Sequence, residues 1–210
     1  MEFEAEKHRE QKRKARPAKT LEQEKQKIKV YPMKLPLKTE RLHITKFESN
    51  MAETVYRLSL DEDNRRFVPD EVFESVSEAQ KIIDTINKWY AEENAPLIYA
   101  ITLDNQHIGH VQAIPLKEAN WEIGYHIGKE HTGKGYATEV VKAFLPNIMK
   151  HLEISKIYGL CHTENTASRK VLEKSDFVLV FKGEGTLHGK IQEICRYVYS
   201  LSEEENQIEN

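Results

Sequence analysis

Residues 121–149 read WEIGYHIGKEHTGKGYATEVVKAFLPNIM, and this stretch decides the fold. Its first seven residues alternate between apolar side chains and polar or small ones, which is the period of a strand. A turn with two glycines follows. Apolar residues then recur at helical spacing, and they are Ala137, Val140, Val141, Phe144, Leu145 and Ile148. The stretch therefore predicts a strand, a glycine-containing turn and a helix.

The turn itself has the features of an anion site. Gly133 and Gly135, one residue apart at a helix start, let the backbone turn its N–H groups toward one point. The helix dipole adds partial positive charge there and Lys134 adds a full charge. A phosphate or pyrophosphate site is one interpretation, and a purely steric use of the two glycines is the other. The spacing excludes a Walker A loop, and the third glycine of a dinucleotide fingerprint is missing.

The same stretch resembles the acetyl-CoA-binding core of the GNAT acetyltransferases, and most closely their ribosomal-protein N-acetyltransferase (RimJ/RimL-like) branch. Residues 122–125 (EIGY) and 133–139 (GKGYATE) match that branch, and residues 129–130 (KE) stand where Pro-Glu is usual. The family's Q/R-x-x-G-x-G/A loop stands here as residues 130–135 (EHTGKG), with Glu130 departing from the pattern. The resemblance covers roughly residues 37–201, and it implies an α+β fold with a mixed central sheet flanked by helices.

The remaining pattern predicts elements that agree with this order. Strands are expected over 37–47, 97–103, 106–114, 120–127, 156–162, 177–181 and 190–201. Helices are expected from Asn50 to about Leu60, from Ser77 to about Asn94, from Ala137 onward and from Asn165 to Lys174.

Local signals refine these boundaries. Capping boxes are expected at Asn50 with Glu53 and at Ser77 with Gln80. Residues 61–73 read as polar and irregular. Pro146 should kink or end the long helix. The last two strands should be joined by a glycine-rich hairpin that contains Gly183, Gly185 and Gly189.

Charge divides the chain into three parts. Residues 1–30 hold ten Lys/Arg against six Asp/Glu, so they carry +4 of a total of −3, and residues 31–210 carry −7. We expect a charged extension over 1–30, disordered or a solvated helix, then a single domain over 31–202 and an acidic tail over 203–210. The basic run 12–16 (KRKAR) could touch RNA, although a solvated tail is the simpler interpretation. The acidic domain argues against nucleic-acid binding and mildly favours amine substrates.

Composition also bears on location and metals. No apolar run approaches the ~18 residues of a membrane span, and the charged N-terminus is unlike a signal peptide. Cys161 and Cys195 lie in strand-like runs, which favours structural burial and a reducing cytoplasm. The histidines are scattered, so we expect no metal site.

The resemblance implies how acetyl-CoA would bind. In that family the pantetheine pairs with unpaired backbone groups of a central strand that splays from its neighbour, and here those groups would belong to His126, Ile127 and Gly128. The pyrophosphate would lie on backbone N–H groups at the helix start, which are those of Thr132, Gly133, Lys134, Gly135, Tyr136 and Ala137. Acetyl-CoA is therefore the expected cosubstrate.

The resemblance also implies catalytic residues. Residues 165–168 (NTAS) resemble the N-x-x-S helix of the RimJ/RimL-like branch, in which Asn165 would cap the helix or bind the pantetheine, and Ser168 would protonate the leaving thiolate. Ser168 could equally be a small polar contact. Glu122 is the first candidate for the general base, directly or through water, with a purely structural carboxylate as the alternative. Glu184 is the second candidate.

The function expected from these features is N-acetyl transfer from acetyl-CoA to a primary amine, either a protein N-terminus or a small molecule. Dimers are common among the resembled proteins. One alternative is a CoA-binding sensor or partner subunit without turnover, which the departure at Glu130 favours weakly. Another is a ribosome- or RNA-associated factor that uses residues 1–30.

Overall fold

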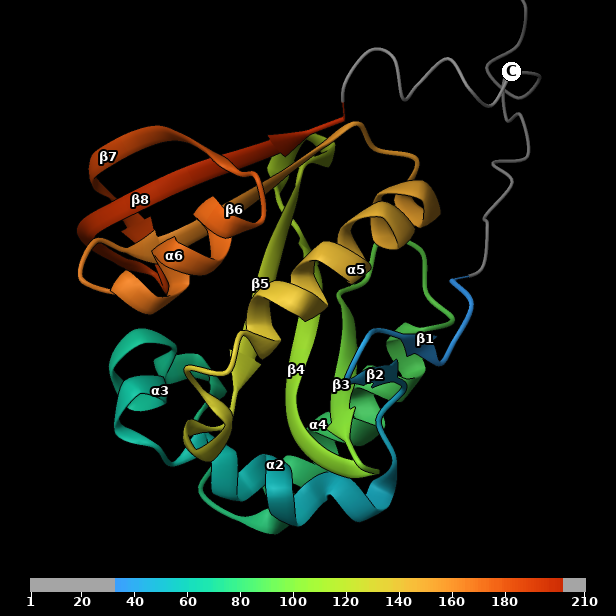
Figure 1. Cartoon of the computed structure of the whole chain (residues 1–210). Helices are drawn as coiled ribbons and strands as arrows, with labels where there is room; N and C mark the ends of the chain where they lie inside the picture. Colours follow the sequence, from blue (N-terminus) through green and yellow to red (C-terminus); the bar gives the residue numbers. More distant parts are fainter. Residues whose placement is uncertain (1–32, 202–210) are drawn as a thin grey trace, which may run out of the picture. The chain divides into compact units, whose positions relative to one another are not determined.

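The computed structural model describes residues 33–201 (Figure 1). The predictions for the extension 1–30 and the tail 203–210 fall outside these residues. Within the described part, eight strands form one sheet in the order β1-β2-β3-β4-β5-β6-β8-β7. Neighbouring strands are antiparallel except β5 and β6, which are parallel. The predicted α+β fold with a mixed sheet is confirmed.

The strands and helices alternate in a way that the sequence largely predicts. The strands are β1 (Leu37–Lys38), β2 (His43–Thr45), β3 (Leu97–Leu103), β4 (Gln106–Pro115), β5 (Trp121–Ile127), β6 (Lys156–His162), β7 (Val178–Leu187) and β8 (Lys190–Ser200). The α-helices are α2 (Ala52–Ser59), α3 (Glu62–Phe67), α4 (Val76–Trp89), α5 (Tyr136–Leu152) and α6 (Thr166–Lys174). Short 3-10 turns are η1 (Ser49–Met51), η2 (Pro69–Glu71), η3 (Lys117–Ala119) and η4 (Lys129–His131).

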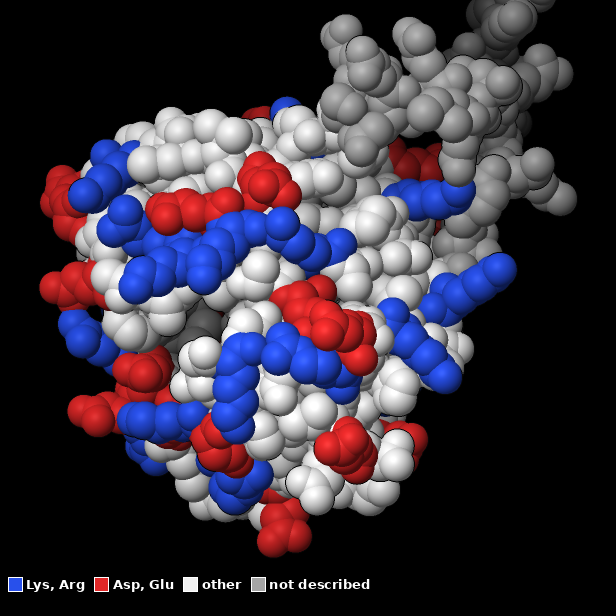
Figure 2. Space-filling view, in the orientation of Figure 1, with Lys and Arg blue, Asp and Glu red and all other residues white. Residues whose placement is uncertain are grey.

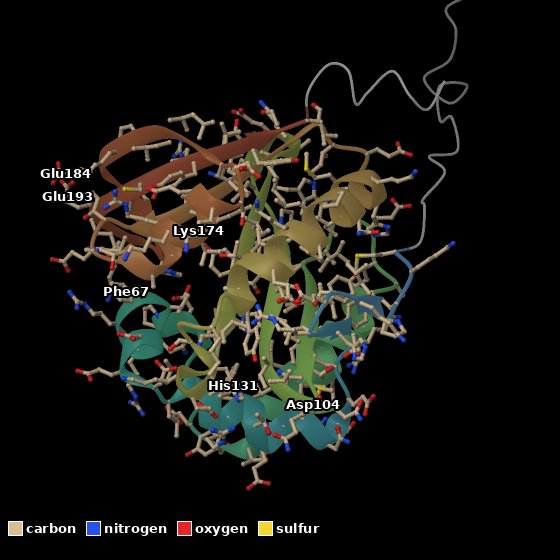
Figure 3. All side chains as sticks on the ribbon, viewed as in Figure 1. Phe67, Asp104, His131, Lys174, Glu184 and Glu193 are labelled. Atoms are coloured by element: carbon tan, nitrogen blue, oxygen red, sulfur yellow. The ribbon has the colours of Figure 1, made fainter. Side chains whose placement is uncertain are left out.

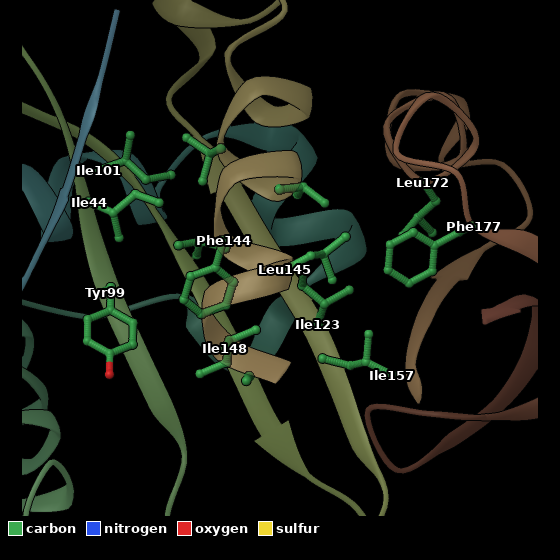
Figure 4. Packing of buried hydrophobic residues seen from close by; sticks show 14 of the residues in the cluster. Ile44, Tyr99, Ile101, Ile123, Phe144, Leu145, Ile148, Ile157, Leu172 and Phe177 are labelled. Carbon is green, nitrogen blue, oxygen red and sulfur yellow. The ribbon is translucent and has the colours of Figure 1, made fainter. Parts of the chain in front are cut away.

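The core lies on both faces of the sheet. Helix α5 crosses one face over β4 and β5, and its Phe144, Leu145 and Ile148 pack against strand residues such as Ile123 (Figures 1 and 4). The opposite face carries α2 and α4, where Ile83 and other apolar side chains form a second cluster with β3. Each strand therefore presents alternate side chains to two different helical layers.

Strand β5 shows this alternation most clearly. Trp121, Ile123 and Ile127 are buried on the side of α5. Between them, Gly124 and His126 point to the other face, where Gly124 lies opposite Gln112 of β4. A Cβ atom at Gly124 would lie only 2.6 Å from the Gln112 amide nitrogen, so this glycine makes room for the glutamine side chain.

The predicted divergence of the central strand from its neighbour is confirmed. Strands β5 and β6 share a single register pair, Glu122 with Tyr158. Beyond Glu122 no further pairing joins these two strands within residues 33–201, whereas β4 and β5 pair over their whole length. The sheet therefore opens at the carboxyl end of β5.

Cys161 and Cys195 are both buried and both carry free thiols, as expected for structural residues. They lie opposite each other in the register of β6 and β8. Burial raises the pKa of the Cys161 thiol to about 12, so this side chain stays protonated and unreactive at neutral pH.

Three predictions near the start of the domain are wrong. The strand expected over 37–47 is two short strands, because the Thr39 hydroxyl accepts from the Leu42 N–H at 2.9 Å and forms a turn between them. The cap expected at Asn50 is absent, since α2 begins after η1 without a side-chain cap bond. The segment 61–73 is not irregular: it contains α3, whose first turn is capped by Asp61 Oδ1 accepting from Asn64 N–H at 2.8 Å.

The N-cap of α4 lies two residues before the predicted cap. Ser75 Oγ accepts from the Glu78 N–H at 3.2 Å, and Glu78 Oε2 accepts from the Glu74 N–H at 2.7 Å. The capping box is therefore Ser75 with Glu78, not Ser77 with Gln80. The helix ends at Trp89, well before Asn94.

Two predictions in the second half also need correction. Helix α5 does not end at Pro146 but continues to Leu152. The Asn147 side-chain amide donates to Ala143 O at 2.9 Å in the same turn, and buried side chains on both sides of the proline hold the helix together. The last hairpin turns at His188-Gly189, because β7 extends to Leu187 and includes Gly183 and Gly185.

Candidate functional site

A cleft of about 620 Å³ lies where β5 and β6 separate. One wall comes from α3, including Arg66 and Phe67, and the other from α6, including Ser168 and Lys174. The start of α5 forms the floor at one end. Figure 3 shows Phe67 and Lys174 on opposite sides of the gap between α3 and α6.

Charged side chains of both signs line the cleft, and the acidic ones are Asp61, Asp63 and Glu164. Figure 2 shows a hollow in this face with Lys and Arg side chains above and below it. The basic side chains that line the cleft are Arg66, Lys129, Lys170 and Lys174. Arg66 is paired with Glu164, whereas Lys170 and Lys174 of α6 offer positive charge to an anionic ligand.

The glycine turn at the start of α5 adopts the conformation that an anion site needs. Gly133 and Gly135 have φ values of 74° and 83°, which favour glycine. No heavy atom lies within 4 Å of the place where a Cβ of Gly133 would stand, so the backbone is open to a ligand. The predicted residues Thr132, Gly133, Gly135, Tyr136 and Ala137 all line the cleft.

Sequence reasoning missed the residues that hold this turn in place. Glu139 in the first turn of α5 accepts from Arg41 Nε at 2.7 Å and from Arg41 N–H at 2.8 Å. Arg41 also donates to Lys134 O at 3.1 Å and lies over the Tyr136 ring at 4.5 Å. Residues 39–42 (TERL) and 133–139 (GKGYATE) are therefore parts of one contact, and the signal in the sequence was the presence of both motifs in one chain.

Two predicted cofactor contacts need correction. The predicted charge of Lys134 is directed elsewhere, because Lys134 Nζ donates to Glu130 O at 3.0 Å and the residue does not line the cleft; the prediction for its backbone N–H is unaffected. The expected unpaired N–H of Gly128 is wrong, because it donates to Ile108 O of β4 at 2.8 Å.

The backbone groups that face the opening can be assigned from this bond. Since Gly128 N–H faces β4, strand alternation directs the groups of His126 to β4 as well, where His110 is its register partner. The groups of Tyr125 and Ile127 point the other way, toward the gap beside β6. Both residues line the cleft, so the prediction is wrong for the backbone groups of His126 and Gly128, while Ile127 faces the opening together with Tyr125.

Asn165 and Ser168 lie together at the start of α6. Asn165 Oδ1 accepts from the Ser168 N–H at 3.0 Å, which is the predicted helix cap. Tyr125 Oη lies 3.0 Å from Ser168 Oγ and donates to Ser168 O at 2.9 Å. Burial raises the pKa of Tyr125, so the phenol keeps its proton. Two hydroxyl groups are thus joined in the cleft, and the contribution of Tyr125 was not predicted.

Glu122 is a partly buried carboxyl on β5, on the face away from α5. Burial raises its pKa from 4.5 to about 7, although the charges of His188 and Arg196 act in the opposite direction. No hydrogen bond or ion pair to Glu122 occurs within residues 33–201. Its side chain lines neither this cleft nor the smaller cavity described below.

The second base candidate is far from this opening. Glu184 is exposed on β7 and lies opposite Glu193 of β8 in the register. Figure 3 shows the two glutamates together at the outer part of the β7–β8 hairpin. Neither lines the cleft or the smaller cavity.

The smaller cavity, of about 170 Å³, lies between the sheet and the helices α2 and α4. His126 and Asn64 line both spaces, so the two cavities share a wall. In the part of the chain that the structure describes, three or more His, Cys, Asp or Glu side chains do not gather as a metal site would require. Among the same residues, none of the helices has the length and hydropathy needed to cross a membrane.

Comparison with known proteins places this geometry in context. The family described as "Acetyltransferase (GNAT) domain" matches residues 41–178. The chain is 29% identical over 176 residues to "Uncharacterized N-acetyltransferase p20" of Bacillus licheniformis, covering 80% of this chain and 97% of that protein.

Solved structures agree on the fold. A GNAT-family acetyltransferase from Bacillus anthracis has 25% identity and a TM-score of 0.66, with 78% of this chain and 97% of that chain covered. RimL, a ribosomal L7/L12 alpha-N-protein acetyltransferase solved in complex with coenzyme A, has 17% identity and a TM-score of 0.67, with 79% and 97% covered.

Proposed function

The chain belongs to the GNAT acetyltransferase family, and from that premise we propose that it transfers the acetyl group of acetyl-CoA to a primary amine by direct attack in a ternary complex. The observation that carries the proposal is the gap between β5 and β6. These strands share only one register pair, and the gap between them lies beside the glycine turn of α5. A strand edge with unpaired backbone groups can bind an extended amide-containing chain, and the adjacent turn can bind its phosphates.

The cleft residues suit the successive parts of coenzyme A. Backbone N–H groups over 132–137 would bind the pyrophosphate, with Lys170 and Lys174 near the anionic end. The groups of Tyr125 and Ile127 would pair with the pantetheine amides. The Asn165 oxygen is used by the helix cap, which leaves its amide N–H₂ to donate to pantetheine.

The thioester end would then lie beside the two joined hydroxyls. The amine nitrogen attacks the thioester carbon and forms a tetrahedral adduct. When the C–S bond breaks, the thiolate takes a proton from the Ser168 hydroxyl, which Tyr125 Oη orients from 3.0 Å away. Solvent returns a proton to the Ser168 oxygen. The amine loses one proton to a base, so the products are an amide and free thiol.

We propose Glu122 as that base. A pKa of about 7 suits a group that must be ionised to accept a proton and yet be a strong enough base near neutral pH. Because Glu122 lines neither cavity, the proton would reach it through a water molecule. Glu184 is a poorer candidate because it is exposed on the outer hairpin.

The acceptor proposed here is a protein N-terminus or a small-molecule amine, and a homodimer in the cytoplasm is the proposed state. The two buried free thiols are in keeping with a reducing compartment. The alternative, a protein that binds CoA without turnover, would share the cleft but lack a productive acceptor.

The test is thiol release from acetyl-CoA by the full chain against pooled peptides and small amines, with Ser168→Ala beside the wild type. We expect release that needs an acceptor and falls at least about 10-fold in the variant, equivalent to ~1.4 kcal/mol of barrier. Ser175→Ala, which changes a buried serine just after α6, is the matched control. Tight CoA binding in calorimetry without release for any amine would refute the proposal and favour the non-catalytic alternative.

A further inference from the structure

The smaller cavity has an apolar wall and a polar one. Its apolar lining includes Val55 and Leu58 of α2 together with Ile82, Ile86 and Trp89 of α4. Its polar lining comes from the sheet and from η2. A volume of about 170 Å³ is close to that of ~150 Å³ cavities that bind benzene, so a single ring or a branched aliphatic group would fill it.

Two carboxylate–histidine pairs lie at the polar side: Glu71, His110 and His126 line this cavity, whereas Asp61 lines the cleft. Glu71 Oε2 lies 3.3 Å from His110 Nε2, and Glu71 Oε1 accepts from the Gln112 amide at 3.1 Å. Asp61 Oδ2 lies 3.3 Å from His126 Nε2. The rings of His110 and His126 are 5.7 Å apart, so the four charged or polar side chains form one cluster.

Both carboxylates in this cluster stay ionised at neutral pH. Burial raises the pKa of Glu71, but the charge and hydrogen bond of His110 and the bond from Gln112 outweigh it and lower the pKa to about 2. The hydrogen bond with His126 lowers the pKa of Asp61. Their oxygens are therefore available as hydrogen-bond acceptors for the N–H groups of an amine.

The imidazole ring of His107 also lines this cavity. His107 packs edge-on against Phe47 with ring centroids 5.5 Å apart, and neither of its ring nitrogens makes a hydrogen bond of ordinary geometry within residues 33–201. Burial lowers the pKa of His107 to about 4, so the ring is neutral. Unpaired buried nitrogens are costly, and they are expected where a ligand supplies the missing bond.

The position of the cavity relates it to the proposed reaction. His126 and Asn64 line both the smaller cavity and the cleft proposed for acetyl-CoA, so the two spaces adjoin at these residues. The polar cluster lies on this shared wall, whereas the apolar side chains of α4 lie beyond it.

We propose that this cavity binds the acceptor, and that the acceptor is a primary amine joined to one uncharged apolar group the size of a single ring, with its nitrogen beside the Asp61–His126 pair. This inference rests on the proposed acetyl transfer. A peptide with an apolar first residue and a free arylalkyl amine share this chemistry.

The test compares acceptors in matched pairs. Peptides beginning with Phe or Leu are compared with those beginning with Ser or Asp, and 2-phenylethylamine is compared with ethanolamine. We expect kcat/KM to be at least about 10-fold higher for the apolar member of at least one pair. The pair with the larger ratio shows whether the acceptor is a peptide or a free arylalkyl amine. Turnover of polar acceptors with no preference for apolar ones overturns the inference while leaving acetyl transfer intact.

Variants test whether this cavity causes the preference. Val55→Phe on α2 and Ile82→Phe on α4 should each fill it and raise KM for the apolar acceptor about 10-fold, with less than about 2-fold change for the polar one. Tyr56→Phe, beside Val55 but outside both cavities, is the matched control. The melting temperature and its shift with CoA verify folding. Unchanged selectivity in both folded variants overturns the inference.

A binding measurement separates the two proposals. Trp89 lines the cavity and is one of two tryptophans in the chain, so 2-phenylethylamine should change its fluorescence saturably, and Trp89→Phe should remove the signal. Saturable binding without acetyl transfer to any amine supports the cavity while refuting the proposed function. Absence of both binding and preference refutes the cavity assignment.

Discussion

Replacing Glu122 with glutamine gives a direct test of the proposed base. With a pKa of about 7, the wild-type carboxylate is about half ionised at pH 7 and only ~9% ionised at pH 6. A carboxyl with the ordinary value of 4.5 would be almost fully ionised at both pH values. We therefore expect kcat to rise with pH along a limb centred near 7, and Glu122→Gln to remove that limb and lower kcat by about 10²-fold or more.

The assay is thiol release at saturating acetyl-CoA and acceptor, from pH 5.5 to 9. Acceptors with different amine pKa values separate the two origins of a limb, because one that belongs to the enzyme stays in place while one that belongs to the amine moves. Glu184→Gln is the matched control, since Glu184 is an exposed glutamate on the outer hairpin. A Glu122→Gln enzyme that keeps both kcat and the limb near 7 would refute the assignment.

The same substitution has a consequence for stability with a defined sign. The pKa of Glu122 is raised from 4.5 to about 7 in the folded state, so the native protein binds more protons than the unfolded chain between these pH values. The free energy of unfolding then falls as pH rises through this window. Glutamine cannot ionise, so Glu122→Gln should be more stable than wild type at pH 8 by up to ~3 kcal/mol, at ~1.4 kcal/mol per pKa unit. The difference should vanish near pH 4, and equal urea-unfolding curves at pH 8 would contradict the burial argument.

Two further predictions concern the cofactor cleft. Tyr125→Phe removes a hydroxyl that bonds both Ser168 Oγ and Ser168 O. We expect kcat in the thiol-release assay to fall about 10-fold, and the free energy of unfolding in urea to fall by ~1 kcal/mol. A kcat within about 2-fold of wild type would limit Tyr125 to packing. Arg41→Gln breaks the contact with Glu139 and Lys134 O that holds the glycine turn. The Kd for CoA in calorimetry should rise about 10-fold, as expected for charged hydrogen bonds, while kcat at saturation stays within about 2-fold. Lys142→Gln, which changes an exposed cation on α5, is the control, and equal effects of the two substitutions would refute the role of Arg41.

The cofactor half of the site could be predicted because its determinants are local in the sequence. The glycine turn, the start of α5 and the Asn165–Ser168 cap each depend on residues within a few positions of one another, so pattern alone places them. The backbone contacts were predicted less well, because the pairing of Gly128 with Ile108 depends on the register between two strands. That register follows from packing on both faces of the sheet and cannot be read from one strand.

The acceptor half could not be predicted, because its residues come from four separate segments. Asp61 belongs to the cap of α3, Glu71 to η2, His110 to β4 and His126 to β5. The helix α3 was itself missed, since six polar-rich residues give too short a pattern to distinguish a helix from a loop. Only the closure of the sheet against α2 and α4 brings these side chains together. Of the four, the sequence predicts a role for His126 alone, and that role is a backbone contact to pantetheine.

The departure of Glu130 from the family loop is the main argument for a protein without turnover, and the structure weakens it. Glu130 Oε1 accepts from Arg57 Nη1 of α2 at 2.7 Å, and its side chain does not line the cleft. The negative charge of Glu130 therefore faces away from the site proposed for the pyrophosphate, and Arg57 neutralises it. The anion site is built from backbone N–H groups and from glycines with positive φ, and neither depends on the side chain at position 130. A glutamate there is therefore compatible with acetyl-CoA binding, and it gives no reason to prefer binding alone over turnover.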